Sequence, residues 1–312
     1  MKYYLGIDGG GTTTRAVLAD ARGNAIATAR AGSLNYLAVG VEAARESLRG
    51  IVGQIAPPGP PSAIHAAFIG NAALAGPAPE NELRALCEGI LEPEFLAMDS
   101  DLYIALETLD THPKEPAGSP GIPGSGPCAV AIAGTGSMAA GRAGEAAPVL
   151  HTGGWGWLLG DEGSGFHVAW EGIRAALRGH EGSGPATALT GDLCAHYNVG
   201  EPEALLDLFY DPPKEHHEIA SFARVVLRSD DAAARAIVSR CAGEFAQTVR
   251  ALLAKLPEET WLGLWGGMFQ HSGAYRATFC QALGKKAQLL PMAPEWGAVR
   301  AAMRLGGDCR GG

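Results

Sequence analysis

Short apolar strands and longer amphipathic helices alternate along the first hundred residues. Apolar residues at three- and four-residue spacing predict helices over 41–55 and 80–91, and another helix is expected to begin near Asp101. Apolar runs predict five strands, at 3–7, 15–20, 25–29, 64–70 and 95–98. Three strands are therefore followed by alternating helices and strands, which indicates an α/β unit.

The second half of the chain repeats this plan with additional helices. Two strands at 128–133 and 138–142 flank a turn, and a strand near 262–265 precedes another glycine turn. Ser272 is expected to cap a helix that carries apolar residues at spacing four. Further helices are predicted around 166–177, 237–256 and 292–306. The repeated order predicts an α/β, two-domain actin-like (ribonuclease H-like) ATPase fold with a cleft between the domains.

The length of 312 residues suits two domains, because single cores stop growing at about 250–300 residues. We predict an N-terminal domain at 1–111, a C-terminal domain at 128–293, and a closing helix within 294–312 that packs back on the first domain. Segment 112–127 is rich in Pro, Gly and Ser and has no periodicity. It is predicted to be a connector or a surface insertion at the domain junction.

The most informative motif is Leu5–Thr14, where an apolar strand runs into Asp8, three glycines and three threonines. Glycines allow backbone N–H groups to approach an anion closely, and threonine hydroxyls donate to phosphate oxygens. Asp8 is suited to hold, through water, a phosphate-bound Mg²⁺. A second strand follows, whereas a P-loop or a dinucleotide site would open a helix. The motif therefore predicts a hairpin that binds phosphate.

Two further glycine turns follow in a consistent order. Gly134–Ser137 lies between two strands and presents Thr135 and Gly136, while Gly266 and Gly267 follow the late strand and lead toward a helix. One such turn alone is commonly just a hairpin. Together the three match, in order, the phosphate-1, phosphate-2 and adenosine motifs of the sugar-kinase/actin/heat-shock-protein superfamily.

Phosphoryl transfer to a hydroxyl needs a base that accepts the proton. Asp101 is our candidate, since it follows a short strand at the expected start of a helix. Asp99 is the competitor two residues earlier. The alternative for both residues is that they simply cap the helix.

The segment 153–166 contains six glycines, Trp155, Trp157, and the acidic pair Asp161 and Glu162 just ahead of a predicted helix. Aromatic faces beside carboxylates suit a sugar, whose C–H faces stack on rings and whose hydroxyls donate to carboxylates. The alternative is a structural glycine-rich loop around buried tryptophans.

With these motifs the whole chain resembles the N-acetylglucosamine kinase/glucosamine kinase group of the BadF/BadG/BcrA/BcrD-type ATPase family. The specific markers are Gly153–Gly156 and Gly160–Ser164, supported by Asp8–Thr12 and Ala133–Ser137. The resemblance implies a kinase that uses ATP and Mg²⁺ to phosphorylate the 6-hydroxyl of N-acetylglucosamine or a related amino sugar. It also implies a homodimer.

The resemblance further implies a role for individual residues. Those expected to face the phosphates are Asp8, Gly10, Gly11, Thr12 and Thr13, and Gly266 and Gly267 are expected to face the adenosine. Those expected to face the sugar are Asn35, Thr135, Trp155 and Asp161, with Asp101 as the catalytic aspartate. Two departures stand out: Ser100 replaces the usual Asn or Thr before the aspartate, and 112–127 is inserted.

Bulk properties exclude other classes. The formal charge of −9 argues against general nucleic-acid binding. No apolar run approaches the roughly 18 residues that a membrane span needs, and Met1–Tyr3 leads directly into the first strand without a signal peptide. The six cysteines form no C-x-x-C pair, which fits reduced thiols and a cytoplasmic location.

Some alternatives stay open from the sequence. The related activators of 2-hydroxyacyl-CoA dehydratases and benzoyl-CoA reductases would need thiolates for an iron–sulfur cluster, and Cys128 and Cys194 have the pattern of core residues. A non-enzymatic actin-like sensor or regulator is a further class. His216 and His217 are interpreted as a solvated turn rather than a metal site. The sugar is undecided among N-acetylglucosamine, glucosamine, N-acetylmuramic acid and glucose.

Overall fold

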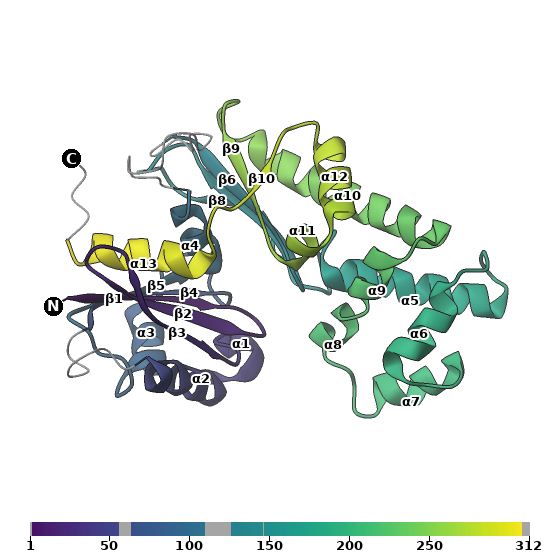
Figure 1. Cartoon of the computed structure of the whole chain (residues 1–312), viewed down its shortest axis with the longest axis horizontal. Coiled ribbons are helices and arrows are strands. Elements are labelled where there is room, and N and C mark those ends of the chain that lie inside the picture. The colour runs from purple at the N-terminus through teal and green to yellow at the C-terminus, as the bar shows by residue number, and fades with distance from the viewer. Residues whose placement is uncertain (1, 56–63, 110–125, 146, 308–312) are drawn as a thin grey trace. The chain divides into compact units, whose positions relative to one another are not determined.

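The computed structural model describes residues 2–55, 64–109, 126–145 and 147–307. The chain divides into two compact units, which we describe separately (Figure 1). Unit 1 comprises Met1–Ser125 with Leu290–Gly312, and unit 2 comprises Gly126–Leu289. Most of the predicted connector at 112–127 lies outside the described residues.

Unit 1 is built on a five-stranded sheet in the order β3-β2-β1-β4-β5. The strands are β1 (Tyr3–Gly9), β2 (Thr14–Asp20), β3 (Ala25–Ala31), β4 (Ile64–Asn71) and β5 (Phe95–Ser100). β1, β2 and β3 pair antiparallel, while β1, β4 and β5 run parallel. The carboxyl ends of the three parallel strands therefore meet at one edge of the sheet.

Helices cover both faces of this sheet (Figure 1). They are α1 (Tyr36–Val39), α2 (Val41–Gln54), α3 (Glu80–Cys87), α4 (Asp101–Glu107) and α13 (Pro294–Leu305). Alternate strand residues enter opposite cores: Leu5 and Ile7 pack on the α2–α3 side, and Tyr4 packs on the α4–α13 side. Gly6 lets α13 approach β1 closely, because a Cβ there would lie 2.4 Å from the Glu295 carbonyl oxygen.

Unit 2 repeats the strand plan of unit 1. Its sheet order is β10-β9-β6-β7-β8. β7 pairs antiparallel with β6 and with β8, while β6, β9 and β10 run parallel. The strands are β6 (Cys128–Ala133), β7 (Ser137–Arg142), β8 (Leu150–Gly153), β9 (Trp261–Trp265) and β10 (Gln288–Leu289). The β6–β7 turn thus occupies the position that the β1–β2 turn occupies in unit 1.

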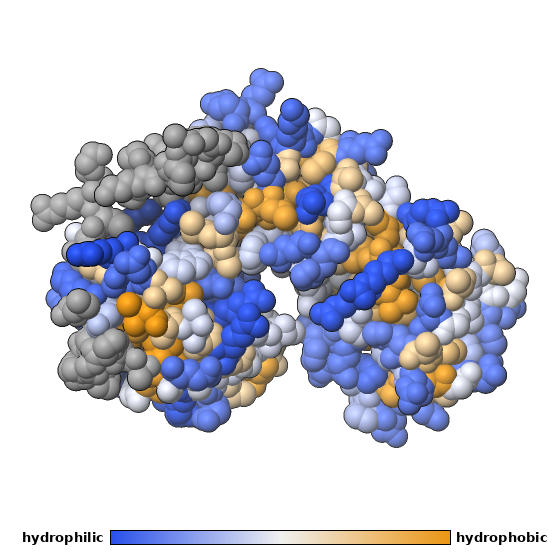
Figure 2. Space-filling view, viewed as in Figure 1, coloured by the Kyte–Doolittle hydropathy of each residue, from blue (hydrophilic) through white to orange (hydrophobic). Residues whose placement is uncertain are grey.

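The remaining helices belong to unit 2. They are α5 (Gly165–Glu181), α6 (Leu189–Tyr197), η2 (Pro202–Ala204), α7 (Leu205–Tyr210), α8 (His216–Ala220), α9 (Ala223–Arg228), α10 (Ala232–Leu253), α11 (Gly267–His271) and α12 (Gly273–Leu283). α5, α10 and α12 bury one core against β6 and β9, in which Phe245, Phe269 and Phe279 are fully buried. Hydrophilic side chains cover much of the visible surface of each unit (Figure 2).

The two-domain α/β fold predicted from the sequence is confirmed, and differences occur at element ends. α3 stops at Cys87 rather than Leu91, and β5 continues to Ser100 rather than Met98. Ser272 caps α12 as predicted, since its hydroxyl accepts the N–H of Tyr275. His216 and His217 open the short helix α8 and do not form the predicted turn. No described helix is long and apolar enough to cross a membrane.

Candidate active site

Acidic residues gather where the parallel strands of unit 1 end. In the strand register Asp8 lies opposite Gly70, and Gly70 lies opposite Asp99. Asp101 opens α4 directly after β5. Gly70 leaves room for α4 at this edge, because a Cβ there would come within 2.3 Å of Ile104. The sheet register therefore brings together carboxylates that are about ninety residues apart in the chain.

Hydrogen bonds hold the glycine turn after β1 in place, while its outer residues are exposed to solvent. The Gly10 N–H donates to the Thr13 carbonyl at 3.2 Å, and the Ser33 hydroxyl donates to the Gly10 carbonyl at 3.2 Å. Gly11, Thr12 and Thr13 are exposed, and a Cβ at Gly11 would meet no atom within 4 Å. The turn keeps a fixed shape while its outer residues remain accessible to an anion.

Asn35 lies in the same neighbourhood, because its backbone N–H donates to the Ser33 hydroxyl at 3.0 Å. Its side-chain oxygen accepts from the Ala38 N–H at 3.2 Å and caps α1. Asn71, fully buried at the end of β4, fixes this loop by donating to the Leu34 carbonyl at 3.0 Å. In the sequence Asn71 is marked only as a polar residue at the end of a buried apolar strand, a signal too weak to predict this role.

The electrostatics of this edge favour neutral carboxyl groups. Burial raises the pKa of Asp8 to about 8, and the charges of Asp101 and Glu295 add to this effect, while Arg15 opposes it. Burial also raises the pKa of Asp101 to about 6, against the stabilising hydrogen bonds of backbone N–H groups at the start of α4. A cation bound at this edge would favour the ionised form of both carboxyl groups.

Glu295 is the second residue that the sequence analysis missed. It lies in the first turn of α13, and its Oε2 is buried without a hydrogen-bond partner among the described residues. No local motif marks it, because only the packing of α13 against β1 brings it near Asp8. It adds a further carboxylate near Asp8 at this edge.

The alternative in which both aspartates act as helix caps is wrong for this structure. Ser100 is the N-cap of α4, and its hydroxyl accepts the N–H of Tyr103 at 3.2 Å. Asp99 instead accepts the N–H of Ser100 at 2.6 Å and is almost fully buried. Ser100, not either aspartate, is thus the N-cap residue, although backbone N–H groups at the start of α4 also donate to the Asp101 carboxylate.

In unit 2 the corresponding turn holds Thr135 and Gly136 between β6 and β7. The Thr135 carbonyl accepts from the Phe166 N–H at 3.1 Å, so the turn is tied to the start of α5. Asp161 packs on it: its Oδ1 accepts the N–H of Ser137 at 3.1 Å, and a Cβ at Gly136 would lie 2.7 Å from its Oδ2. Burial is the largest cause of a raised pKa at Asp161.

The third glycine turn lies beside the second. Gly266 adopts φ 101° and follows β9, which pairs with β6. A Cβ at Gly266 would lie 2.3 Å from the Ala133 carbonyl oxygen, so any side chain would collide with the end of β6. Gly267 then opens α11. Thr135, Gly136, Asp161 and the adenosine-motif glycines are thus assembled at one edge of the second sheet.

The tryptophan segment is exposed rather than buried. Trp155 is 73% exposed and Trp157 is 43% exposed, so the alternative of a structural loop around buried tryptophans is wrong. Gly153, Gly154 and Gly156 have φ between 73° and 78°, where glycine is favoured. Trp155 presents an accessible aromatic face a few residues from Asp161.

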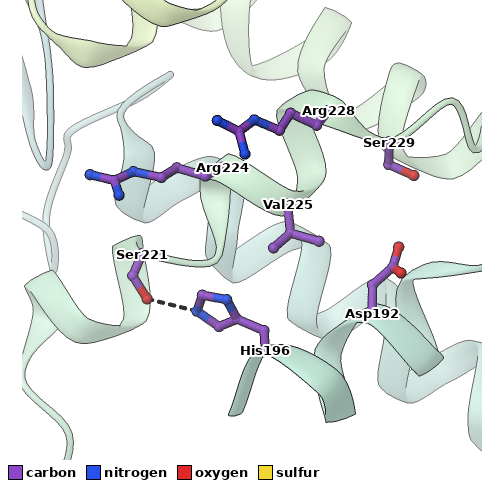
Figure 3. A pocket seen from close by; sticks show the side chains of 7 residues that line it. All are labelled: Asp192, His196, Ser221, Arg224, Val225, Arg228 and Ser229. Carbon is purple, nitrogen blue, oxygen red and sulfur yellow. Dashed lines mark hydrogen bonds between the residues drawn. The ribbon is translucent and has the colours of Figure 1, made fainter. Parts of the chain in front are cut away.

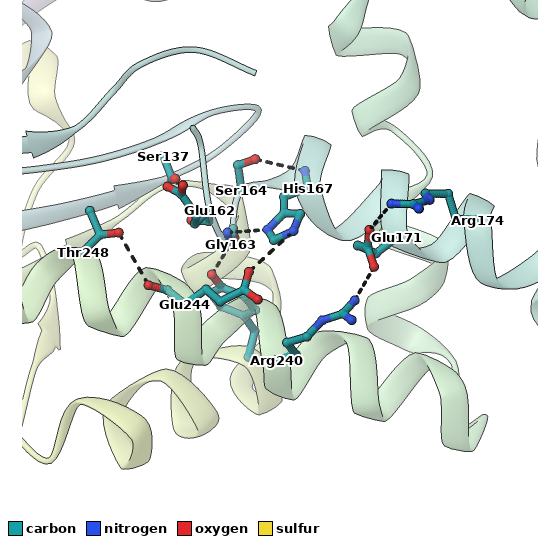
Figure 4. Close-up of polar contacts among 11 residues, drawn as sticks. Ser137, Glu162, Gly163, Ser164, His167, Glu171, Arg174, Arg240, Glu244 and Thr248 are labelled. Carbon is teal, nitrogen blue, oxygen red and sulfur yellow. Dashed lines mark hydrogen bonds and ion pairs between the residues drawn. The ribbon is translucent and has the colours of Figure 1, made fainter. Parts of the chain in front are cut away.

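A polar network holds the end of this segment in place (Figure 4). The Gly163 N–H donates to His167 Nδ1 at 3.0 Å, while His167 Nε2 lies 3.6 Å from Glu244. The Tyr275 hydroxyl donates to the Gly163 carbonyl at 2.5 Å, and the Ser137 hydroxyl donates to the Glu162 carbonyl at 2.7 Å. Residues 161–164 are therefore fixed on both sides of the acidic pair.

The described residues contain no cluster of three or more His, Cys, Asp or Glu side chains suited to chelating a metal ion. Cys87, Cys128, Cys194, Cys241 and Cys280 are all free thiols. Burial raises the pKa of both Cys87 and Cys241 to about 12, so these two are protonated, unreactive thiols.

The sequence of the chain was compared with models of known protein families. The BadF/BadG/BcrA/BcrD ATPase family matches residues 5–83 and 117–303, which is most of the chain and includes all three glycine turns. The chain belongs to this family.

Among curated relatives, an N-acetylmuramic acid/N-acetylglucosamine kinase of Clostridium acetobutylicum is 34% identical over 130 residues, covering 41% of this chain and 42% of the relative. An N-acetyl-D-glucosamine kinase of Dictyostelium discoideum is 28% identical over 219 residues, covering 67% and 65%. The matches thus span less than two thirds of these relatives.

Among solved structures, a candidate N-acetylglucosamine kinase of Chromobacterium violaceum has the same fold. Its TM-score is 0.72 at 23% identity, over 96% of this chain and 98% of that one.

Proposed function

We propose that this family member is an ATP-dependent kinase that transfers the γ-phosphoryl group of ATP to the 6-hydroxyl of an amino sugar, with N-acetylglucosamine as the first candidate. The observation that carries the proposal is the proximity of the Asp8 and Asp101 carboxyl groups beside an open Gly/Thr turn, at the carboxyl ends of parallel strands. The names of the curated relatives support an amino sugar as the acceptor.

Two turns are assigned to the phosphates of ATP. In unit 1 the exposed Gly11, Thr12 and Thr13, with Gly10, offer hydroxyls and backbone N–H groups. In unit 2 Thr135 and Gly136 offer the same chemistry at the equivalent turn. Gly266 and Gly267 are assigned to the adenosine: Gly266 holds the turn close against the end of β6, and a Cβ at Gly267 would meet only the His271 ring, at 3.6 Å.

The residues at the edge of the first sheet fit a magnesium ion. Asp8 would hold it through water, since Mg²⁺ keeps several waters and binds through one or two carboxylates plus substrate phosphates. Burial raises the pKa of Asp8, and the charges of Asp101 and Glu295 add to this effect, so a bound cation would favour the ionised carboxylate. When bound, Mg²⁺ would neutralise phosphate charge.

Asp101 is assigned as the base. With a pKa of about 6 its carboxylate is mainly ionised at pH 7, yet basic enough to accept the proton of the sugar hydroxyl. The hydroxyl oxygen then attacks the γ-phosphorus, the bond to the β-phosphate oxygen breaks, and ADP leaves. Hydrogen bonds at the start of α4 hold the Asp101 carboxylate in place during this step.

Sugar binding is assigned to Asn35, Thr135, Trp155 and Asp161. Trp155 offers an exposed ring for the apolar face of a sugar, and Asp161 can accept from hydroxyls. Asn35 belongs to unit 1, whereas Thr135, Trp155 and Asp161 belong to unit 2.

An ADP-release assay coupled to a reporter enzyme tests the function. N-acetylglucosamine, glucosamine, N-acetylmuramic acid and glucose are compared at equal concentration with a sugar-free control. We expect sugar-dependent ADP release, with N-acetylglucosamine giving the highest kcat/KM and phosphorus NMR showing a 6-phosphate. ADP release that no sugar stimulates would refute the proposal.

The competing candidate is an ATPase activator of a 2-hydroxyacyl-CoA dehydratase or benzoyl-CoA reductase system. It would require thiolates that meet at a cluster, yet Cys128 is buried in β6 and Cys194 lies on α6. An iron–sulfur absorption band in anaerobically purified protein would favour it.

A homodimer and a cytoplasmic location stay predictions, and light scattering tests the predicted homodimer.

A further inference from the structure

A separate cavity lies among the short helices of unit 2 (Figure 3). It has a volume of about 490 Å³ and is formed by residues of α6 and α9 and by the residues that follow α8 and α9. None of its lining residues belongs to the site described above. Its size falls within the range of about 300–1,000 Å³ that is usual for small-molecule sites.

One side of the cavity is cationic. Arg224 and Arg228 lie one turn apart on α9, and their side chains extend in the same direction (Figure 3). Within the described part of the chain, neither guanidinium has a hydrogen bond or an ion pair with a protein group. Arginine is always charged and presents a planar fork of donors that matches a phosphate group. Two unpaired guanidiniums on one helix face are therefore a binding surface for a phosphate-sized anion.

His196 faces the same cavity in a defined tautomer. The Ser221 hydroxyl donates to the Glu218 carbonyl at 2.5 Å, so it can only accept from His196 Nε2, which lies 2.8 Å away. Burial, and then the charge of Arg224, lowers the pKa of His196, so the ring is neutral at pH 7. A bound anion would offset the effect of Arg224 on this ring.

The rest of the lining is not suited to a bare anion. Asp192 on α6 is a hydrogen-bond acceptor, Ser229 adds a hydroxyl, and Val225 lies between them and the arginines (Figure 3). A carboxylate repels phosphate but accepts hydrogen bonds from sugar hydroxyls. The cavity therefore combines a cationic side with a side that accepts hydroxyls, and a phosphate ion alone would fill only part of it.

We propose that this cavity is a second ligand site, which binds a sugar phosphate with its phosphate on Arg224 and Arg228 and its hydroxyls toward Asp192 and Ser229. This chemical class includes the product of the proposed kinase reaction, so the site would sense product. Only the choice of sugar rests on the proposed function; the anion site itself does not.

Calorimetric titration of the full chain without ATP tests the proposal. The probes are N-acetylglucosamine 6-phosphate, inorganic phosphate and unphosphorylated N-acetylglucosamine. The double variant Arg224→Gln/Arg228→Gln should weaken sugar-phosphate binding by about tenfold or more for each arginine, because hydrogen bonds to charged groups are lost. Arg178→Gln, an exposed arginine on α5 outside the cavity, is the matched control and should bind as the wild type does.

Asp192→Asn separates a sugar phosphate from free phosphate. It should weaken sugar-phosphate binding several-fold and leave phosphate binding equal or tighter. Equal affinity of the wild type and the double arginine variant for the sugar phosphate would overturn the site. Binding of phosphate as tight as that of the sugar phosphate, unaffected by Asp192→Asn, would overturn the sugar part. Circular dichroism verifies folding, and the ADP-release assay reports separately on the kinase reaction.

Discussion

Replacing Asp101 with Asn tests the proposed base most directly. The change removes the negative charge and the proton-accepting ability while preserving side-chain size, and it leaves the Ser100 cap of α4 in place. A positioned general base contributes typically about 10²–10⁴-fold, so we expect kcat to fall by that factor, or by about 3–5 kcal/mol in the activation free energy. The KM for ATP should change little.

The pH dependence follows from the raised pKa of Asp101. The ionised form is active, so activity is lost as pH falls. With a pKa of about 6, about nine tenths of the carboxyl groups are ionised at pH 7, and kcat/KM should fall about tenfold per pH unit well below 6. This acid limb should disappear from the residual activity of Asp101→Asn.

Two neighbours supply the controls. Asp99→Asn should retain most activity, since the Asp99 side chain already accepts the Ser100 N–H and is nearly buried. Ser100→Ala should lower the free energy of unfolding by about 0.5–2 kcal/mol through loss of the cap without a comparable loss of kcat. If Asp99→Asn is the inactive variant, the base is Asp99. If neither Asp101→Asn nor Asp99→Asn loses more than about tenfold in kcat, below the usual contribution of a general base, the proposed mechanism is wrong.

Three further predictions concern other parts of the protein. Asp161→Asn should raise the sugar KM about tenfold or more through loss of a charged acceptor, with the ATP KM unchanged. The fold should be preserved, because Asn tolerates the φ of 62° and keeps the hydrogen bond to the Ser137 N–H. Equal rises in both KM values would contradict sugar binding. Gly163→Ala should lower the melting temperature far more than Gly182→Ala, since both have φ near 75° but only at Gly163 would a Cβ lie 2.6 Å from Phe245; equal shifts would show that strain alone matters. Without metal, the free energy of unfolding should decrease from about pH 4 to pH 8, because folded Asp8 retains a proton up to about pH 8 that the unfolded carboxyl has already lost. Asp8→Asn should flatten this slope, and an unchanged slope in thermal unfolding would refute the shift.

The sequence by itself determined the local structure of this protein. Glycine and hydroxyl turns between apolar strands depend on short-range backbone chemistry, so the β1–β2 and β6–β7 hairpins and the turn after β9 were predictable. Periodic apolar residues likewise fixed α2, α5 and α10. Repetition of these elements in one order was enough to predict the fold class.

Element ends and electrostatic neighbours were decided only by the tertiary structure. β5 extends to Ser100 because its last residues pair with Gly70 and Asn71 of β4, a contact that no local pattern encodes. Glu295 lies near Asp8 because α13 packs on β1. Asp161 lies against the turn at Gly136 because its side chain accepts the N–H of Ser137. The raised pKa values of Asp8 and Asp101 have the same origin, since burial and the proximity of distant charges exist only once the chain has folded.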